Sequence, residues 1–135
     1  MGVPLYPPHF ALPLFEPFYR HLAEGELWLT VDPRDGSWLW YPPEAVPGAP
    51  EVSPEWRRAS DVGTIYSHTT IVRSLLPRDH SAEVPFTVVL FEPEDAAGSR
   101  VAGLWLGDEP PACDARARFE PIRAGDWTLP GFRSL

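Results

Sequence analysis

Proline is the residue that most limits what this chain can fold into. The 135 residues include 18 prolines, and these are spread along the whole sequence. A proline inside a helix removes a hydrogen bond and clashes with the preceding turn, so long helices are excluded over most of the chain. The sequence therefore predicts short, frequently interrupted elements within one globular domain.

One short helix is predicted near the N-terminus. Pro17 suits the first helical turn, Phe18 and Leu22 share one face with Tyr19 beside them, and Gly25 stands where helices commonly end. The apolar, proline-rich residues 1–14 precede it. We expect them to form an extended arm that lies on a surface of this chain or of a partner, with a disordered terminus as the alternative.

The next 33 residues are predicted to contain a hairpin and a loop. Apolar residues alternate in residues 26–41 on both sides of Asp32–Gly36, which indicates two strands joined by a turn. Residues 42–54 carry five prolines and are predicted to be a loop.

A small barrel is predicted after residue 59. Segments rich in Val, Ile, Thr and aromatic residues are typical of strands, and they occupy residues 62–75, 84–94, 99–107 and 115–122. Strands at this spacing, with no helical pattern between them, favour a mainly β fold with a closed antiparallel barrel. We expect residues 126–135 to form an irregular tail.

Composition restricts the partners of the chain. Its formal charge is −8, all 11 basic residues are arginines, and Cys113 is the single cysteine. A single-strand nucleic-acid binder is disfavoured because the aromatic residues lack an accompanying basic surplus. No run reaches the roughly 18 apolar residues that a membrane helix needs, so we expect a soluble cytoplasmic protein.

No catalytic set can be assembled from the sequence. Ser67 and His68 are adjacent, but neighbouring residues of a strand point to opposite faces and should not form a nucleophile–base pair. The motifs of nucleophile elbows, zinc proteases, dinucleotide sites and phosphate loops do not occur.

Asp32 and Asp35 are the one pair that suggests a metal. A hard cation needs about six oxygen ligands, and this turn offers too few. Zinc would require Cys or His, and residues 26–60 contain neither. On the residues alone, the stretch is predicted to be a simple turn.

Six stretches of the sequence resemble, in the same order, the DUF35 family of OB-fold proteins. They are FYRHLAEGELWL, DPRDG followed by Pro42 and Pro43, VPGA, SDVGTIYSHTTIVR, VPFTVVLFEPE and LPGF. Members of that family have a short N-terminal helix, a rubredoxin-like zinc ribbon and a five-stranded OB barrel. The resemblance thus implies an arm and helix in residues 1–25, a ribbon in residues 26–58, and a barrel with its tail in residues 59–135.

The resemblance also implies that the ribbon has lost its metal. The four zinc-binding cysteines of the family correspond to Asp32, Asp35, Val46 and Ala49 in this sequence. Because Val and Ala have no ligand atoms, we expect a metal-free ribbon and no cofactor. Buried aromatic area would stabilise it instead, and the candidates are Trp28, Trp38, Trp40 and Trp56.

The function implied by the family is that of an accessory subunit. DUF35 proteins bind thiolase-fold enzymes that transfer, condense or cleave acyl-CoA thioesters, including retro-aldolases of steroid side chains. We therefore expect a non-catalytic subunit of a heteromeric complex, with two-plus-two stoichiometry in the family, that stabilises its partner and shapes the acyl-CoA site. The expected interface residues are Phe15, Phe18, Tyr19, Trp28, Trp38 and Trp40.

A stand-alone acyl-CoA-binding module is the alternative. In that case an arginine of the barrel would contact the phosphates of CoA, and the candidates are Arg73, Arg100 and Arg118. Each of them is equally compatible with a solvated surface position.

Overall fold

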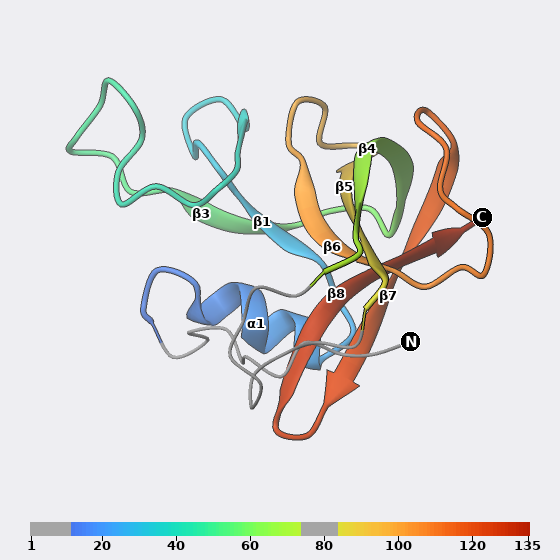
Figure 1. Ribbon diagram of the computed structural model, residues 1–135. Coiled ribbons are helices and arrows are strands. Elements are labelled where there is room, and N and C mark those ends of the chain that lie inside the picture. The colour runs from blue at the N-terminus through green and yellow to red at the C-terminus, as the bar shows by residue number, and fades with distance from the viewer. Residues whose placement is uncertain (1–11, 74–83) are drawn as a thin grey trace.

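The computed structural model describes residues 12–73 and 84–135, and Figure 1 shows their arrangement. The N-terminal part contains the helix α1 (Glu16–Ala23) and the strands β1 (Trp28–Val31), β2 (Trp38–Leu39) and β3 (Glu55–Arg58). The remaining strands are β4 (Val62–Ile71), β5 (Phe86–Pro93), β6 (Val101–Trp105), β7 (Arg116–Ala124) and β8 (Trp127–Ser134). Most of the predicted arm (residues 1–11) lies outside the described residues.

The helix α1 confirms the sequence prediction. A proline occupies its first turn, and Phe18 and Leu22 are its buried residues. Gly25 has φ of +83°, a conformation that a residue with a side chain rarely adopts. The helix ends there because the amide of Gly25 donates to Leu22 O and the amide of Glu26 donates to His21 O.

The strands β1, β2 and β3 form a three-stranded antiparallel sheet, which we call the ribbon sheet. The predicted hairpin is confirmed, because Thr30 pairs with Leu39 and Val31 with Trp38. Strand β3 was not predicted. Its sequence, EWRR, has a single apolar residue and directly follows the proline-rich loop, so its only reason to be extended is the pairing with β1, in which Leu29 lies opposite Arg57.

Strands β4 to β8 form a closed barrel in the order β4-β5-β6-β8-β7, and pairing of β4 with β7 completes the circle. The prediction of an irregular tail in residues 126–135 is wrong, because most of that segment is strand β8. Pro130 and Gly131 interrupt the strand pattern in the sequence, but Pro130 lies opposite Pro121 of β7, where the ladder tolerates it.

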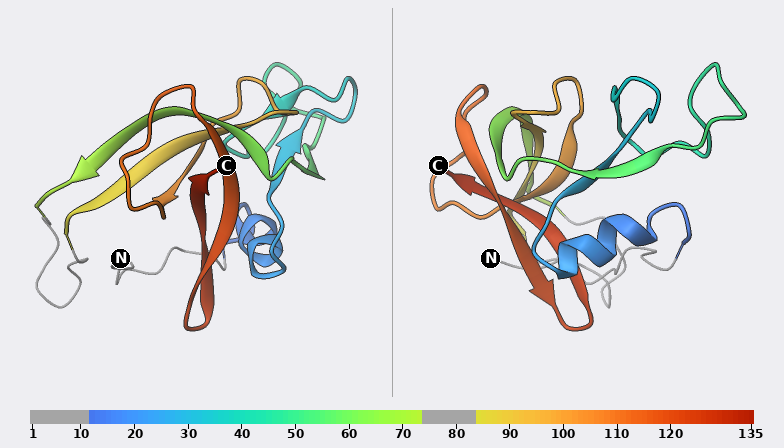
Figure 2. Two further views of the ribbon diagram at one scale, coloured as in Figure 1. Left: turned by 90° about the vertical axis from the view of Figure 1, so that its right-hand side faces the viewer. Right: turned by 180° about the vertical axis from the view of Figure 1, so that it is seen from behind.

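The barrel is not entirely antiparallel, which corrects a second expectation. Strand β8 lies between β6 and β7, and it runs parallel to β6, with Leu104 opposite Gly131. A connection that places the last strand between two earlier ones belongs to the Greek-key order of the OB fold. Figure 2 shows β4 and β5 running together beyond the rest of the barrel.

The helix, the ribbon sheet and the barrel share one hydrophobic core. Leu22 of the helix, Leu27 and Leu29 of the ribbon segment, and Phe91 and Phe132 of the barrel are fully buried and belong to the same cluster. The rings of Phe91 and Phe132 stack with centroids 4.4 Å apart. The three parts therefore form one packing unit. No helix among the described residues has the length and apolar character required to cross a membrane.

Candidate functional site

An apolar pocket of about 280 Å³ lies between the barrel and the N-terminal part of the chain. Its barrel side is formed by strands β5, β6 and β8, with Val88, Leu104 and Leu129 among the lining residues. Its other side consists of aromatic residues from the start of α1 and from the chain after β2. They are Phe15, Phe18, Tyr19, Trp40 and Tyr41.

Aromatic contacts hold the two aromatic segments together. The ring centroids of Phe18 and Trp40 are 4.9 Å apart, and those of Phe18 and Tyr19 are 5.2 Å apart in an edge-on arrangement. Trp40 in turn contacts Tyr41 at 5.3 Å and Trp56 of β3 at 6.1 Å. These distances are those of favourable aromatic pairs, so the helix is attached to the ribbon sheet by this cluster.

None of the described residues that line the pocket is charged. Its polar side chains are Tyr19, Trp40 and Tyr41. Burial raises the pKa of Tyr19, with a further contribution from Tyr41, so its phenol stays protonated at neutral pH. Among the described residues, the buried Trp40 Nε1 has no hydrogen-bond partner. The described lining of the pocket is therefore an uncharged, mainly apolar surface.

The six residues expected at a partner interface have different surroundings. Phe15, Phe18, Tyr19 and Trp40 line the pocket, and Phe18, which is only 5% exposed, also belongs to the core. Trp28 stacks on His21 with ring centroids 4.1 Å apart, and Trp38 packs against the core from the ribbon sheet.

Tyr41 is the pocket residue that sequence reasoning missed, although it is 60% exposed. In the sequence, the feature that could have pointed to Tyr41 is its position directly after Trp40 and before two prolines. The barrel side of the pocket has no such signal, because its residues are ordinary apolar strand residues.

The three arginines proposed as phosphate ligands do not meet at one site. Arg118 pairs with Val62 at the start of β4, whereas Arg73 follows the end of that strand. Ten strand residues separate the two by roughly 30 Å at 3.3 Å per residue. Arg100 lies 3.7 Å above the ring of Tyr66 and pairs with Glu92 at 3.5 Å.

The former zinc positions form a turn and a small apolar contact. Three donor groups of Arg34 reach the Asp32 carboxylate: its amide at 2.9 Å, Nε at 3.1 Å and Nη2 at 2.9 Å. These hydrogen bonds, first of all those from the guanidinium, lower the pKa of Asp32. Asp35 accepts from the amide of Ser37 at 2.9 Å, and this bond lowers its pKa too.

Val46 and Ala49 occupy the other two positions, both buried, and they bridge each other as an isolated β pair. Neither has a donor atom for a metal, and Arg34 already occupies both oxygens of Asp32. The residues present therefore do not fit a zinc ion.

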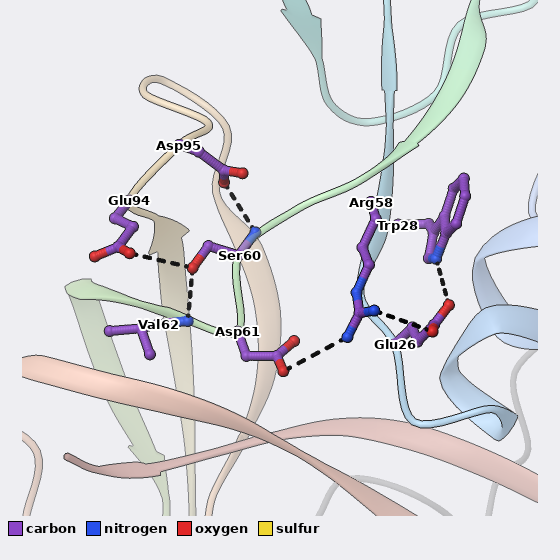
Figure 3. Close-up of polar contacts among 8 residues, drawn as sticks. All are labelled: Glu26, Trp28, Arg58, Ser60, Asp61, Val62, Glu94 and Asp95. Carbon is purple, nitrogen blue, oxygen red and sulfur yellow. Dashed lines mark hydrogen bonds and ion pairs between the residues drawn. The ribbon is translucent and has the colours of Figure 1, made fainter.

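One group of potential ligands occurs elsewhere among the described residues. His21, Glu24 and Glu26 place one ligand atom each within 4.8 Å of one another. Both oxygens of Glu26 have partners, however: Trp28 Nε1 donates to one at 2.9 Å, and Arg58 Nη1 lies 3.2 Å from the other. Figure 3 shows these contacts, which make Glu26 a structural link between the helix end and the ribbon sheet.

The same view shows how the ribbon sheet is joined to the barrel. The amide of Ser60 donates to Asp95 Oδ1 at 2.9 Å, and Ser60 Oγ donates to Glu94 and accepts from the amide of Val62 (Figure 3). Arg58 extends toward Asp61, with the closest atoms 3.9 Å apart. The connection between β3 and β4 is therefore fixed by polar contacts rather than left as a free linker.

Ser67 and His68 show no catalytic arrangement. In the ladder with β5, Ser67 lies opposite Leu90 and His68 opposite Val89, so the two neighbours occupy successive strand positions. A bulge lies just before them, between Ile65 and Ser67.

Two solved structures share the architecture described above. A chain of the Ltp2–ChsH2(DUF35) aldolase matches with a TM-score of 0.80 and 17% sequence identity, over 95% of this chain and 98% of that one. The chain has the DUF35 fold. A DUF35-family protein of unknown function from Sulfolobus solfataricus matches with a TM-score of 0.57 and 12% identity, over 91% of this chain and 86% of that one.

No protein-family model and no curated protein matches the sequence. The DUF35 fold therefore rests on the arrangement of the chain in space. At 17% and 12% identity, the two structures show the fold and leave the function to be proposed.

Proposed function

We propose that this protein is a non-catalytic DUF35 subunit that binds and stabilises a thiolase-fold enzyme acting on acyl-CoA thioesters, and helps to shape its acyl-CoA site. The observation that carries the proposal is the match, over 95% of this chain, to a chain of an aldolase whose description names both Ltp2 and the DUF35 protein ChsH2. The match to this aldolase suggests that the present chain also belongs to a heteromeric complex.

Two features of the chain support an accessory role. Ser67 and His68, the one nucleophile–base pair that the sequence suggested, follow one another along strand β4 and so do not form such a pair. Exposed apolar residues also gather near the start of the helix and after β2: Leu12 is 48%, Leu14 36% and Tyr41 60% exposed. Aromatic and apolar residues of this kind are enriched in the cores of protein interfaces.

Co-purification with a thiolase-fold enzyme of the same organism tests this proposal. Light scattering after size exclusion should show one complex containing both chains, and the activity of the enzyme should fall when this chain is left out. Tyr41→Ser should weaken the complex, whereas Val72→Ser, an exposed apolar residue after the end of β4, should not. An enzyme that is stable, fully active and elutes separately would contradict the proposal.

We also propose that the ribbon sheet folds without zinc and that the protein needs no cofactor. The missing ligand atoms at Val46 and Ala49, and the contacts between Arg34 and Asp32, support this. Elemental analysis of the purified chain should find no stoichiometric zinc, and a chelator should leave its melting temperature unchanged.

A variant with all four ligands restored provides the matched control. It combines Asp32→Cys, Asp35→Cys, Val46→Cys and Ala49→Cys, and it should bind one zinc ion and become sensitive to the chelator. Stoichiometric zinc in the unmodified chain would overturn the proposal. A stand-alone acyl-CoA module, in which one of Arg73, Arg100 and Arg118 would contact the CoA phosphates, stays the alternative; binding of a CoA thioester by the isolated chain in calorimetry would favour it.

A further inference from the structure

The apolar pocket has the chemistry of a site for a proline-rich, extended segment. One of its sides is aromatic, with Phe15, Tyr19, Trp40 and Tyr41 among the lining residues, and none of the described lining residues is charged. Proline-rich segments adopt the polyproline II conformation, which has no internal hydrogen bonds, and they dock in grooves lined by aromatic residues. Because such a segment is extended beforehand, it loses little conformational entropy when it binds.

The chain has a segment of that kind at its N-terminus, in residues 1–11. Three of these residues are prolines, Pro4, Pro7 and Pro8, and none of them is Asp, Glu, Lys or Arg. The proline-rich residues 42–54 differ, because they include two glutamates. A segment without charged side chains can enter an uncharged pocket without the cost of removing a charge from water.

This N-terminal segment is joined to the described chain next to the pocket. The amides of Phe15 and Glu16 donate to Leu12 O at 3.0 and 2.8 Å, so residues 12–15 form a tight turn, and Phe15 at the end of the turn lines the pocket. Eleven residues in the polyproline II conformation span about 34 Å, so the segment is long enough to cross the pocket. A short tether also gives an effective concentration in the millimolar range, so a modest affinity is sufficient.

The volume of the pocket agrees with an occupant that presents small rings. A cavity of about 150 Å³ in another protein holds one benzene molecule. The present pocket measures about 280 Å³, so it has room for about two groups of that size. The adjacent residues Pro7 and Pro8 provide two such rings.

We propose that residues 1–11 occupy the apolar pocket of the same chain, with the rings of Pro7 and Pro8 on its aromatic side. The same segment of a second copy and a segment of another protein are the other occupants that the test distinguishes. This docking concerns the free chain and does not depend on the proposed function. Assembly with an enzyme is measured separately, so the failure of one leaves the other standing.

Paramagnetic relaxation enhancement in the full-length chain tests the proposal. A spin label is attached to Val3→Cys in a Cys113→Ser background, which removes the single native thiol. The label should broaden the amide signals of Ala102 and Leu129, which line the pocket. It should broaden the signal of Arg116 less, because Leu129 pairs with β7 near the end of that strand opposite Arg116.

Variants of the labelled chain locate the contact. The combination of Pro7→Ser and Pro8→Ser removes both rings without changing a residue of the core, and it should abolish the selective broadening at Leu129. Gly2→Ser, which keeps all the prolines, is the matched control and should preserve it. Ala102→Phe narrows the pocket from β6 and should also abolish the broadening at Leu129.

A mixture of two samples identifies the occupant. Spin-labelled chain without ¹⁵N is mixed with ¹⁵N-labelled chain without the spin label, and the signals of Ala102 and Leu129 should then stay sharp. Broadening in this mixture would assign the pocket to the segment of a second copy and would overturn the proposal. Absence of selective broadening in the spin-labelled chain itself would also overturn it, as would broadening that survives both the proline variant and Ala102→Phe.

Discussion

The barrel and the ribbon sheet are both small sheets, but they are completed in different ways. The five barrel strands close on themselves, so each strand has a hydrogen-bonded neighbour on both sides. The ribbon sheet has strands of four, two and four residues, and β2 and β3 are edge strands. Closure satisfies the backbone of the barrel from within, whereas the ribbon sheet depends on what its side chains contact.

In the ribbon sheet, Leu29 and Val31 of β1 are fully buried, and the partly buried Trp38 and Trp56 pack against the shared core. Trp40, just after β2, contacts Phe18 of the helix and Trp56 of β3 on the other side of the sheet order, and this cluster packs against the shared core. The difference teaches that a small open sheet can be joined to a neighbouring core by large aromatic residues.

The largest expected effect is that of Phe91→Ala, which tests whether the two regions share one core. Phe91 is fully buried and stacks on Phe132, so its truncation should lower the free energy of unfolding by about 3–5 kcal/mol. Urea unfolding, followed by tryptophan fluorescence and by far-UV circular dichroism, should show one transition at a lower midpoint. Phe91→Leu, which keeps most of the apolar volume, should cost less. A separate transition for the ribbon tryptophans would show that the core is divided.

A smaller and more local effect is expected for Trp56→Ala. Trp56 is half-buried, so we expect this substitution to lower the free energy of unfolding by roughly 2 kcal/mol, about half the loss for a fully buried aromatic residue. Native-state hydrogen exchange should accelerate mainly at the amides of β1 and β3. Trp127→Ala, at the start of β8, is the matched control and should accelerate exchange in the barrel. Equal acceleration in both regions by Trp56→Ala would argue against a ribbon held locally by aromatic contacts.

The turn at Asp32 should contribute a pH-dependent part of the stability. Because hydrogen bonds from Arg34 lower the pKa of Asp32 in the folded chain, the stabilisation is complete above the unfolded pKa of about 4 and is lost as the pH falls through the folded pKa. Melting temperatures measured between about pH 2 and pH 6 should therefore decline less steeply in Asp32→Asn. Asp126→Asn, in the exposed turn before β8, controls for the change of charge. An unchanged slope in Asp32→Asn would show that the turn has no such role.

The smallest effect is expected at the polar junction. Arg58 is about half exposed, so replacing it with Met should cost less than about 1 kcal/mol, and the difference should shrink in about 0.5 M salt. Urea unfolding at both salt concentrations measures this. Arg20→Met, which removes the exposed pair with Glu16 on the helix, gives the baseline for a surface ion pair. A loss of several kcal/mol for Arg58 alone would mean that the junction, rather than the shared core, joins the ribbon sheet to the barrel.

Local patterns in the sequence predicted the elements that are stabilised locally. The helix has a proline at its start, two apolar residues on one face and a glycine at its end, and the hairpin has alternating residues around a turn. Strands β3 and β8 escaped prediction because nothing in their own residues requires an extended chain. Pairing with β1 makes the residues of β3 extended. Pairing with β6 and β7 keeps β8 extended although it contains Pro130 and Gly131.

The residues of the candidate site were also only partly predictable from the sequence. Phe15, Tyr19 and Trp40 were recognisable as an aromatic group, but the sequence could not separate them from Phe18, whose ring is buried. Tyr41 was overlooked, and the barrel side of the pocket has no distinctive residue. Arg73, Arg100 and Arg118 looked interchangeable in the sequence, but Arg73 and Arg118 lie at opposite ends of β4, and Arg100 packs on Tyr66.

By itself, the sequence determined that the chain is proline-interrupted and mainly β, that Val46 and Ala49 have no ligand atom for a metal, and where the helix and first hairpin lie. These are consequences of local geometry and of the chemistry of single residues. Only the tertiary structure decided that the last segment completes the barrel and that an apolar pocket lies between the barrel, the helix and the chain after β2. Both depend on contacts between residues far apart in the chain, which no short stretch of sequence encodes.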